Sequence, residues 1–126
     1  MSDMKMKEPG PDHPMAIAPN DKRVRVTFAG QVIADTRRAL TLRETTYPPM
    51  HYIPRDDVDM AKLTPADHRS HCPYKGDASY FSIEAEGRRA ENAVWSYQQP
   101  YPAVKAIAGY VCFYPNRVDA IEESEG

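Results

Sequence analysis

Prolines recur along this chain and limit how far any helix or central strand can extend. Twelve of the 126 residues are proline, and six of them separate the predicted strands of the sheet: Pro48, Pro49, Pro54, Pro73, Pro100 and Pro102. Proline lacks the backbone N–H that helix interiors and central strands require. Together with eight tyrosines, a residue type that favours strands, this composition predicts short β-strands rather than long helices.

Apolar and polar residues alternate in several segments, as expected for strands with one buried face. Residues 23–28 show this pattern, Ala29 and Gly30 supply a turn, and residues 32–36 return as the second arm of a hairpin. The same reasoning predicts further strands at residues 40–43, 78–85, 90–97, 109–114 and 116–121.

One short helix is predicted near residues 56–63, where Asp56 or Asp57 can cap the first turn. Residues 64–67 are predicted to turn, and residues 68–76 to form a polar loop. Short strands at fairly regular spacing, with a single short helix, are typical of a mainly β fold. We therefore expect curved antiparallel sheets or two packed sheets.

The length of the chain fits one domain, and its two ends differ in composition from its centre. Residues 1–21 contain four prolines and four methionines and are predicted to form a flexible leader. Residues 22–121 are predicted to form the single β domain, and residues 122–126 an acidic tail.

Targeting and charge patterns favour a cytoplasmic protein with no nucleic-acid or membrane partner. No signal-peptide pattern is visible, and no apolar run approaches the roughly 18 residues needed to span a bilayer. Two cysteines are too few for a secreted disulfide scaffold. The net charge of −2 differs from that of a basic nucleic-acid-binding domain.

Glu44 follows Leu40 and Leu42 on the same face of a predicted strand. A carboxylate on an apolar face needs a partner or a function, because burial of an unpaired charge is unfavourable. One interpretation gives Glu44 a lysine or arginine partner at the floor of a pocket. The other places Glu44 beyond the end of the strand, in solvent.

The segment 68–76 contains side chains that can bind metals or act as nucleophiles. His68, His71 and Cys72 supply at most three zinc ligands, whereas a structural zinc site needs four, so no metal is expected. Cys72 is a candidate redox or acyl nucleophile, and the alternative is a packed structural cysteine. The GxSxG, HExxH and GxGxxG motifs are absent, and no cofactor is expected.

Aromatic residues gather in two predicted strands. Trp95 and Tyr97 are two residues apart and share a face, and Tyr80 lies in the predicted hairpin partner. Stacked together, they can line a concave site in which hydroxyl and indole N–H groups orient a ligand. The alternative is an aromatic core whose polar tips are satisfied. Too few basic residues accompany these aromatics for RNA binding.

Seven separated motifs occur in a characteristic order. They are GQVIADT at 30–36, Glu44, YIPRDDV at 52–58, CPYKG at 72–76, ASYF at 78–81, AVWSYQQP at 93–100 and GYVCFY at 109–114. Over residues 22–119 the chain resembles domain-of-unknown-function family 427 (DUF427). The resemblance implies a small, all-β domain of bacterial type, related to the β-tent group, in which curved antiparallel sheets meet over a cleft.

Relatives in the β-tent group hold zinc on paired Cys-x-x-Cys motifs or, in methionine sulfoxide reductases, use a catalytic cysteine. The paired motifs are missing from this chain. The family has also carried a nucleotidyltransferase-like label, but the paired metal-binding carboxylates on one strand that such chemistry needs are missing as well. The resemblance therefore implies a fold more firmly than an activity.

Polar and aromatic residues within these motifs are the candidate ligand-binding site. They are Glu44, Arg55, Asp57, Lys75, Tyr80, Trp95 and Tyr97. We expect several of them to converge on one cleft that binds a polar or anionic small molecule, with Lys75 or Arg55 as its anchor. A structural alternative pairs Arg55 or Lys75 with Glu44 or Asp57.

Two other functions remain open at this point. One is an enzyme that uses Cys72 as its nucleophile. The other is a structural or interaction module that forms a homodimer through an exposed sheet edge.

Overall fold

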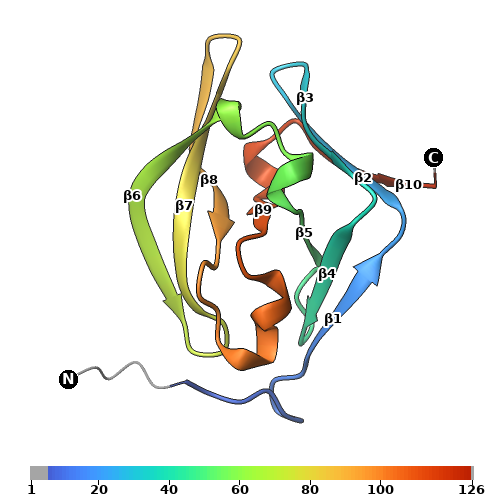
Figure 1. Cartoon of the computed structure of the whole chain (residues 1–126), viewed down its shortest axis with the longest axis vertical. Coiled ribbons are helices and arrows are strands. Elements are labelled where there is room, and N and C mark those ends of the chain that lie inside the picture. Colours follow the sequence, from blue (N-terminus) through green and yellow to red (C-terminus); the bar gives the residue numbers. More distant parts are fainter. Residues whose placement is uncertain (1–5, 126) are drawn as a thin grey trace.

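The computed structural model describes residues 6–125, in which ten strands form three antiparallel sheets (Figure 1). The strands are β1 (Met15–Asn20), β2 (Arg23–Phe28), β3 (Gln31–Thr36), β4 (Ala39–Glu44), β5 (Met50–Tyr52), β6 (Leu63–Cys72), β7 (Gly76–Ala85), β8 (Arg88–Ser96), β9 (Val111–Phe113) and β10 (Ala120–Ser124). The strand orders are β1-β4-β5, β10-β2-β3 and β6-β7-β8-β9. The expected mainly β fold of curved antiparallel sheets is confirmed.

The β2–β3 hairpin forms as its alternation predicts. Val24, Val26 and Phe28 are buried in the core. Ala29 and Gly30 both adopt positive φ angles, of 54° and 76°, as a two-residue turn of type I′ requires. The turn follows the local sequence, whereas the register shifts once between Val26 and Thr27, which leaves Ile33 without a partner on β2.

The four-stranded sheet has apolar side chains on both of its faces, and these form two separate cores. Ala78 and Tyr80 of β7 belong to one core, whereas Phe81 and Ile83 belong to the other. Figure 1 shows this sheet on one side of the molecule and the other two sheets opposite it. We call the core that contains Tyr80 the aromatic core; its buried residues are Leu42, Tyr52, Ala78, Tyr80, Trp95, Tyr97, Val104, Ile107 and Cys112.

The predicted helix near residues 56–63 is instead two short 3-10 turns, η1 (Arg55–Asp57) and η2 (Met60–Lys62). Val58, between them, has extended backbone angles and forms a bridge with Ala34 at the edge of β3. The backbone N–H of Asp59 also donates to the carbonyl of Ile33. These contacts with β3 interrupt the continuous helical hydrogen bonding that the sequence pattern suggested. Two further 3-10 helices are η3 (Pro102–Ile107) and η4 (Pro115–Arg117).

The predicted turn at 64–67 and most of the predicted loop at 68–76 belong instead to β6, which runs to Cys72. Because β6 is an edge strand with most of its side chains exposed, its sequence lacks the alternation of a half-buried strand. Its register shifts by two residues between Ala66 and Arg69, which leaves Asp67 and His68 without partners on β7. Proline is compatible with such an edge position, so Pro65 did not end the strand.

Both predicted domain ends need correction. Residues 15–20 of the predicted leader form β1 and pair with β4, and residues 122–124 of the predicted tail pair with β2. Pro19 lies in an edge strand, where its missing N–H is tolerated. Residues 1–5 and 126, which the leader and tail predictions also include, lie outside the described residues. Among residues 6–125, no helix has the length and apolar character needed to cross a bilayer.

Candidate functional site

Glu44 and Lys75 lie next to each other although they come from different sheets. Lys75 Nζ donates to Glu44 Oε1 at 2.5 Å, and His13 Nε2 lies 2.6 Å from Glu44 Oε2. Glu44 is 7% exposed, at the end of β4. The His13 ring stacks on Tyr74, with 3.8 Å between ring centroids. The prediction that Glu44 has a basic partner is confirmed, and the solvent-exposed alternative is wrong.

The surroundings of Glu44 keep its carboxylate ionised. Burial by itself would raise the pKa of Glu44, but the hydrogen bonds from Lys75 and His13 outweigh burial and lower it below the ordinary value. Each carboxylate oxygen of Glu44 therefore has a hydrogen-bond partner within the fold. This cluster joins the turn after β6 to the end of β4, and Lys75 serves as the partner of a buried carboxylate.

Trp95 lies inside the aromatic core. Its Nε1–H donates to the hydroxyl of Tyr52 at 3.1 Å, and the two rings meet edge to face. Tyr97 is also buried, and burial raises the pKa of both tyrosines. Trp95 therefore belongs to an aromatic core, and its indole N–H is hydrogen-bonded there, which is the second of the two interpretations of the sequence.

Arg55 and Asp57 do not join Glu44 and Lys75. Arg55 Nε donates to the carbonyl of Gly109 at 2.7 Å, and its guanidinium lies 5.3 Å from the centre of the Phe81 ring. Asp57 accepts hydrogen bonds from Thr36 and Arg38. The bond from Arg38 is the main reason why the pKa of Asp57 is lowered. Both residues therefore hold neighbouring segments together at separate places.

The cysteines differ in accessibility. Cys72 is half-buried at the end of β6, opposite Gly76. The neighbouring His71 hydrogen bonds to Asp77 at 2.6 Å, so its Nδ1 is already occupied. Cys112 is completely buried, and burial raises the pKa of its thiol. Within residues 6–125, no three His, Cys, Asp or Glu side chains gather as a metal site.

Tyr80 and Asp57 are predicted site residues that line surface hollows, at separate places, and the hollow at Tyr80 is the one that adjoins the aromatic core. The Tyr80 hydroxyl lies 2.8 Å from Ser70 Oγ and 3.5 Å from the hydroxyl of Tyr114. The Tyr114 ring packs on Trp95, with 4.4 Å between centroids, and the His68 ring packs on Tyr80 at 4.5 Å. The aromatic core thus extends to the surface through Tyr80 and Tyr114.

The cleft has a volume of about 300 Å³ and is lined by polar side chains from four parts of the fold. We call it the polar cleft; its lining residues are His68, Tyr80, Asn92, Tyr114, Asn116 and Arg117. Every one of them carries a hydrogen-bonding group. His68 comes from β6, Tyr80 from β7 and Asn92 from β8. Tyr114 caps the start of η4, and Asn116 and Arg117 lie within η4.

Irregular strand pairing on both sides of β7 brings these residues together. On β6 the unpaired residues are Asp67 and His68; on β8, residues 91–93 lie opposite the single residue Ser82. Asn92 has a φ of 53°, and its backbone N–H donates to Ser82 Oγ. Bulges redirect side chains and are frequent next to functional sites. Two bulges that flank one central strand therefore aim His68 and Asn92 at the same cleft.

Arg117 gives the polar cleft a positive charge. It is exposed, and no carboxylate among residues 6–125 lies within ion-pair distance of its guanidinium. Burial is the main cause that raises the pKa of the adjacent Tyr114, so its hydroxyl stays protonated at neutral pH. The cleft therefore offers a guanidinium, two amides, two phenols and an imidazole.

The sequence pointed to only part of this arrangement. Tyr80 is among the candidate residues, and His68 is one of three side chains considered and rejected as a zinc site, but the sequence does not single out Asn92, Asn116 or Arg117. One signal was present, because Asn92 interrupts a predicted strand and asparagine is disfavoured in strands. The bulges depend on pairing between strands, which a single sequence does not reveal.

The fold and the site define a single all-β domain with a polar cleft at the edge of an aromatic core. A family model described as a domain of unknown function (DUF427) matches residues 16–124. The match covers nearly the whole chain, and the chain belongs to this family, which confirms the resemblance seen in the sequence. A search of curated proteins found no match.

Proposed function

We propose that this domain binds a small polar or anionic molecule in the polar cleft. The observation that carries the proposal is the convergence of His68 and Asn92, from two bulged strands, with Tyr80, Tyr114 and the unpaired Arg117. Two other surface hollows with polar linings contain carboxylates beside their basic groups, whereas the polar cleft contains a guanidinium and no carboxylate.

The chemistry of the lining groups selects the ligand class. A guanidinium is a planar donor that matches a carboxylate or a phosphate, and the side-chain amides of Asn92 and Asn116 offer further donors. The phenol hydroxyls of Tyr80 and Tyr114 can donate or accept. A negatively charged or hydroxyl-rich molecule therefore fits the polar cleft better than an apolar one.

Aromatic support makes the site rigid. Tyr114 lies against Trp95, which is fixed in turn by its hydrogen bond to Tyr52. The backbone N–H of Tyr114 also donates to the carbonyl of Ala93, within the β8 bulge. A site supported in this way loses little conformational freedom when it binds a ligand.

This proposal replaces the anchors expected from the sequence. Lys75 is paired with Glu44, and Arg55 donates to the backbone of Gly109. Arg117 is therefore the cationic anchor in the proposed site, whereas Lys75 and Arg55 hold its scaffold.

A thermal-shift panel tests the proposal. The probes are inorganic phosphate, citrate, benzoate and glucose 6-phosphate, with glucose and benzyl alcohol as neutral partners. At least one anion is expected to raise the Tm in a concentration-dependent manner, because a ligand that binds only the folded state stabilises it. Arg117→Ala should weaken the affinity for that anion about tenfold or more, as expected for a charged hydrogen bond.

Lys105→Ala is the matched control. Lys105 is exposed in η3 and does not line the polar cleft, so this variant removes the same charge elsewhere. It should keep the full Tm response. The proposal is wrong if no anion in the panel raises the Tm, or if both variants reduce the response equally.

A further inference from the structure

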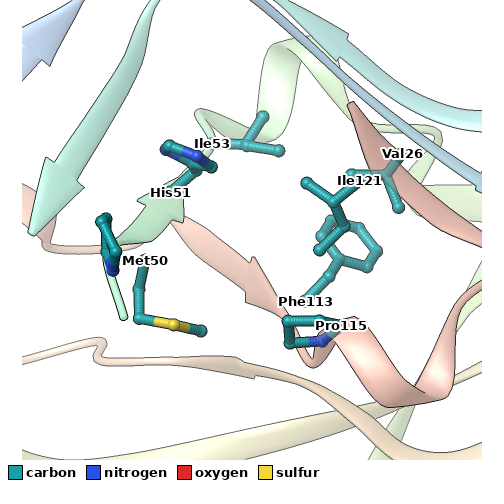
Figure 2. A pocket seen from close by; sticks show the side chains of 8 residues that line it. Val26, Met50, His51, Ile53, Phe113, Pro115 and Ile121 are labelled. Carbon is teal, nitrogen blue, oxygen red and sulfur yellow. The ribbon is translucent and has the colours of Figure 1, made fainter. Parts of the chain in front are cut away.

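A second hollow lies where β5 and β9 meet β2 and β10, and it shares no lining residue with the polar cleft. Its volume is about 200 Å³, and seven of its eight lining residues are apolar. Figure 2 shows Met50, Ile53, Phe113 and Ile121 around this hollow, with the His51 ring at its edge. His51 is the only one of the eight with a polar side chain.

A chain of hydrogen bonds leads from a carboxylate to His51. Asn20 Nδ2 donates to Glu123 Oε2 at 2.6 Å and to Thr41 Oγ1 at 3.1 Å. Asn20 Oδ1 accepts from the backbone N–H of Lys22, which fixes the orientation of the amide. Thr41 Oγ1 lies in turn 2.8 Å from His51 Nδ1.

This chain is compatible with a neutral His51 whose proton lies on Nε2. Thr41 Oγ1 accepts from Asn20 and can donate its own proton to His51 Nδ1. With Nδ1 as the acceptor, a neutral imidazole carries its proton on Nε2. No described residue accepts a hydrogen bond from that Nε2–H.

The surroundings of His51 keep its imidazole uncharged. Burial is the main cause that lowers the pKa of His51, the charge of Arg43 lowers it further, and Glu123 opposes both. The ring is therefore neutral at physiological pH. The hollow presents an uncharged apolar wall and a single N–H donor.

We propose that this hollow binds a small neutral molecule that is largely apolar and carries one hydrogen-bond acceptor, held by His51 Nε2–H. A charged ligand would lose its hydration without gaining an ionic partner here. Apolar cavities of about 150 Å³ hold a benzene-sized molecule, so the hollow fits a single substituted ring. The apolar wall supplies affinity, and His51 selects ligands with an acceptor.

Acetophenone and ethylbenzene are matched probes, because they share a ring and a short side chain and differ in the carbonyl acceptor. In NMR titrations, acetophenone is expected to shift the signals of Ile121 and Phe113 and to bind more tightly than ethylbenzene. His51→Leu should weaken acetophenone binding about fivefold while changing ethylbenzene binding less than about twofold, since it removes a hydrogen bond and keeps the wall apolar.

A substitution that fills the hollow with a larger side chain tests independently whether the probes bind there. Ile121→Trp should abolish binding of both probes, whereas Val32→Trp, on the exposed part of β3, should bind them as wild type does. The proposal is overturned if acetophenone shifts neither Ile121 nor Phe113 in the wild type. It is also overturned if His51→Leu affects the two probes equally, a comparison that does not depend on Ile121→Trp folding.

Discussion

Lys75 Nζ lies 2.5 Å from Glu44 Oε1, in a pair that is almost entirely shielded from water. The pair joins the turn between β6 and β7 to the last residue of β4, and therefore connects two sheets. His13 completes it from the segment before β1. This cluster stabilises the arrangement of strands from which the polar cleft is built, and it takes no direct part in the cleft.

Replacement of Glu44 by Gln should be strongly destabilising. The substitution keeps the shape of the side chain but leaves the Lys75 charge shielded from water without its partner. Loss of one partner of a buried pair costs about 3 kcal/mol. Urea unfolding measures this change.

An ion pair on the surface provides the control for the change in unfolding free energy of Glu44→Gln. Glu84 and Arg89 form an ion pair whose side chains are half-exposed, so Glu84→Gln should cost less than about 1 kcal/mol. If Glu44→Gln costs no more than Glu84→Gln, the cluster around Glu44 does not have the structural role described here.

The same cluster predicts a stability change in acid. The pKa of Glu44 is lower in the folded chain than its ordinary value, so its contribution is present at neutral pH and is lost as the pH falls through the folded pKa. Between pH 7 and pH 3 the Tm of Glu44→Gln should fall less steeply than that of the wild type. Asp35, whose pKa is lowered to about 2 by its hydrogen bond to Arg23, should preserve part of the acid sensitivity in both. Parallel Tm profiles would rule out this role for Glu44.

Tyr52→Phe tests the polar tip of the aromatic core. The variant removes the acceptor for Trp95 Nε1–H, and an unpaired buried donor costs about 1–3 kcal/mol. The free energy of unfolding should fall by that amount, with a change in Trp95 fluorescence of the native state. Tyr47→Phe, at an exposed tyrosine, should leave both quantities unchanged. Equal behaviour of the two variants would contradict the account.

The two thiols should react differently in the native protein. Cys112 is buried and its thiol pKa is raised, whereas Cys72 is half-buried. A maleimide reagent should therefore label the native chain at Cys72, and at both cysteines after unfolding, as mass spectrometry can show. Labelling of Cys112 in the native protein would contradict the buried position described here.

Sequence patterns predicted the parts of the fold that depend on local chemistry. The alternation at Val24, Val26 and Phe28 and the turn at Ala29 and Gly30 determine a hairpin without reference to the rest of the chain. Strand β1 was missed because Pro14 and Pro19 resemble linker residues, although an edge strand tolerates proline.

The candidate site was only partly predictable, for a physical reason. Glu44 could be given a basic partner because a carboxylate on an apolar face requires one. Arg117 and Asn92 could not be placed together, since their proximity depends on bulges in the pairing of β6, β7 and β8. Trp95 shares a face with Tyr97, as expected, but that face lies in a core rather than in a cleft.

The central claim is that the polar cleft binds a small polar or anionic molecule. The most direct measurement is a titration of the ¹⁵N-labelled protein, followed by two-dimensional NMR, with the panel anion that gives the largest thermal shift. The account predicts saturable shifts concentrated at Asn92, Tyr114, Asn116 and Arg117, and their loss in Arg117→Ala. Shifts that are absent from these residues, or that persist unchanged in Arg117→Ala, would contradict it.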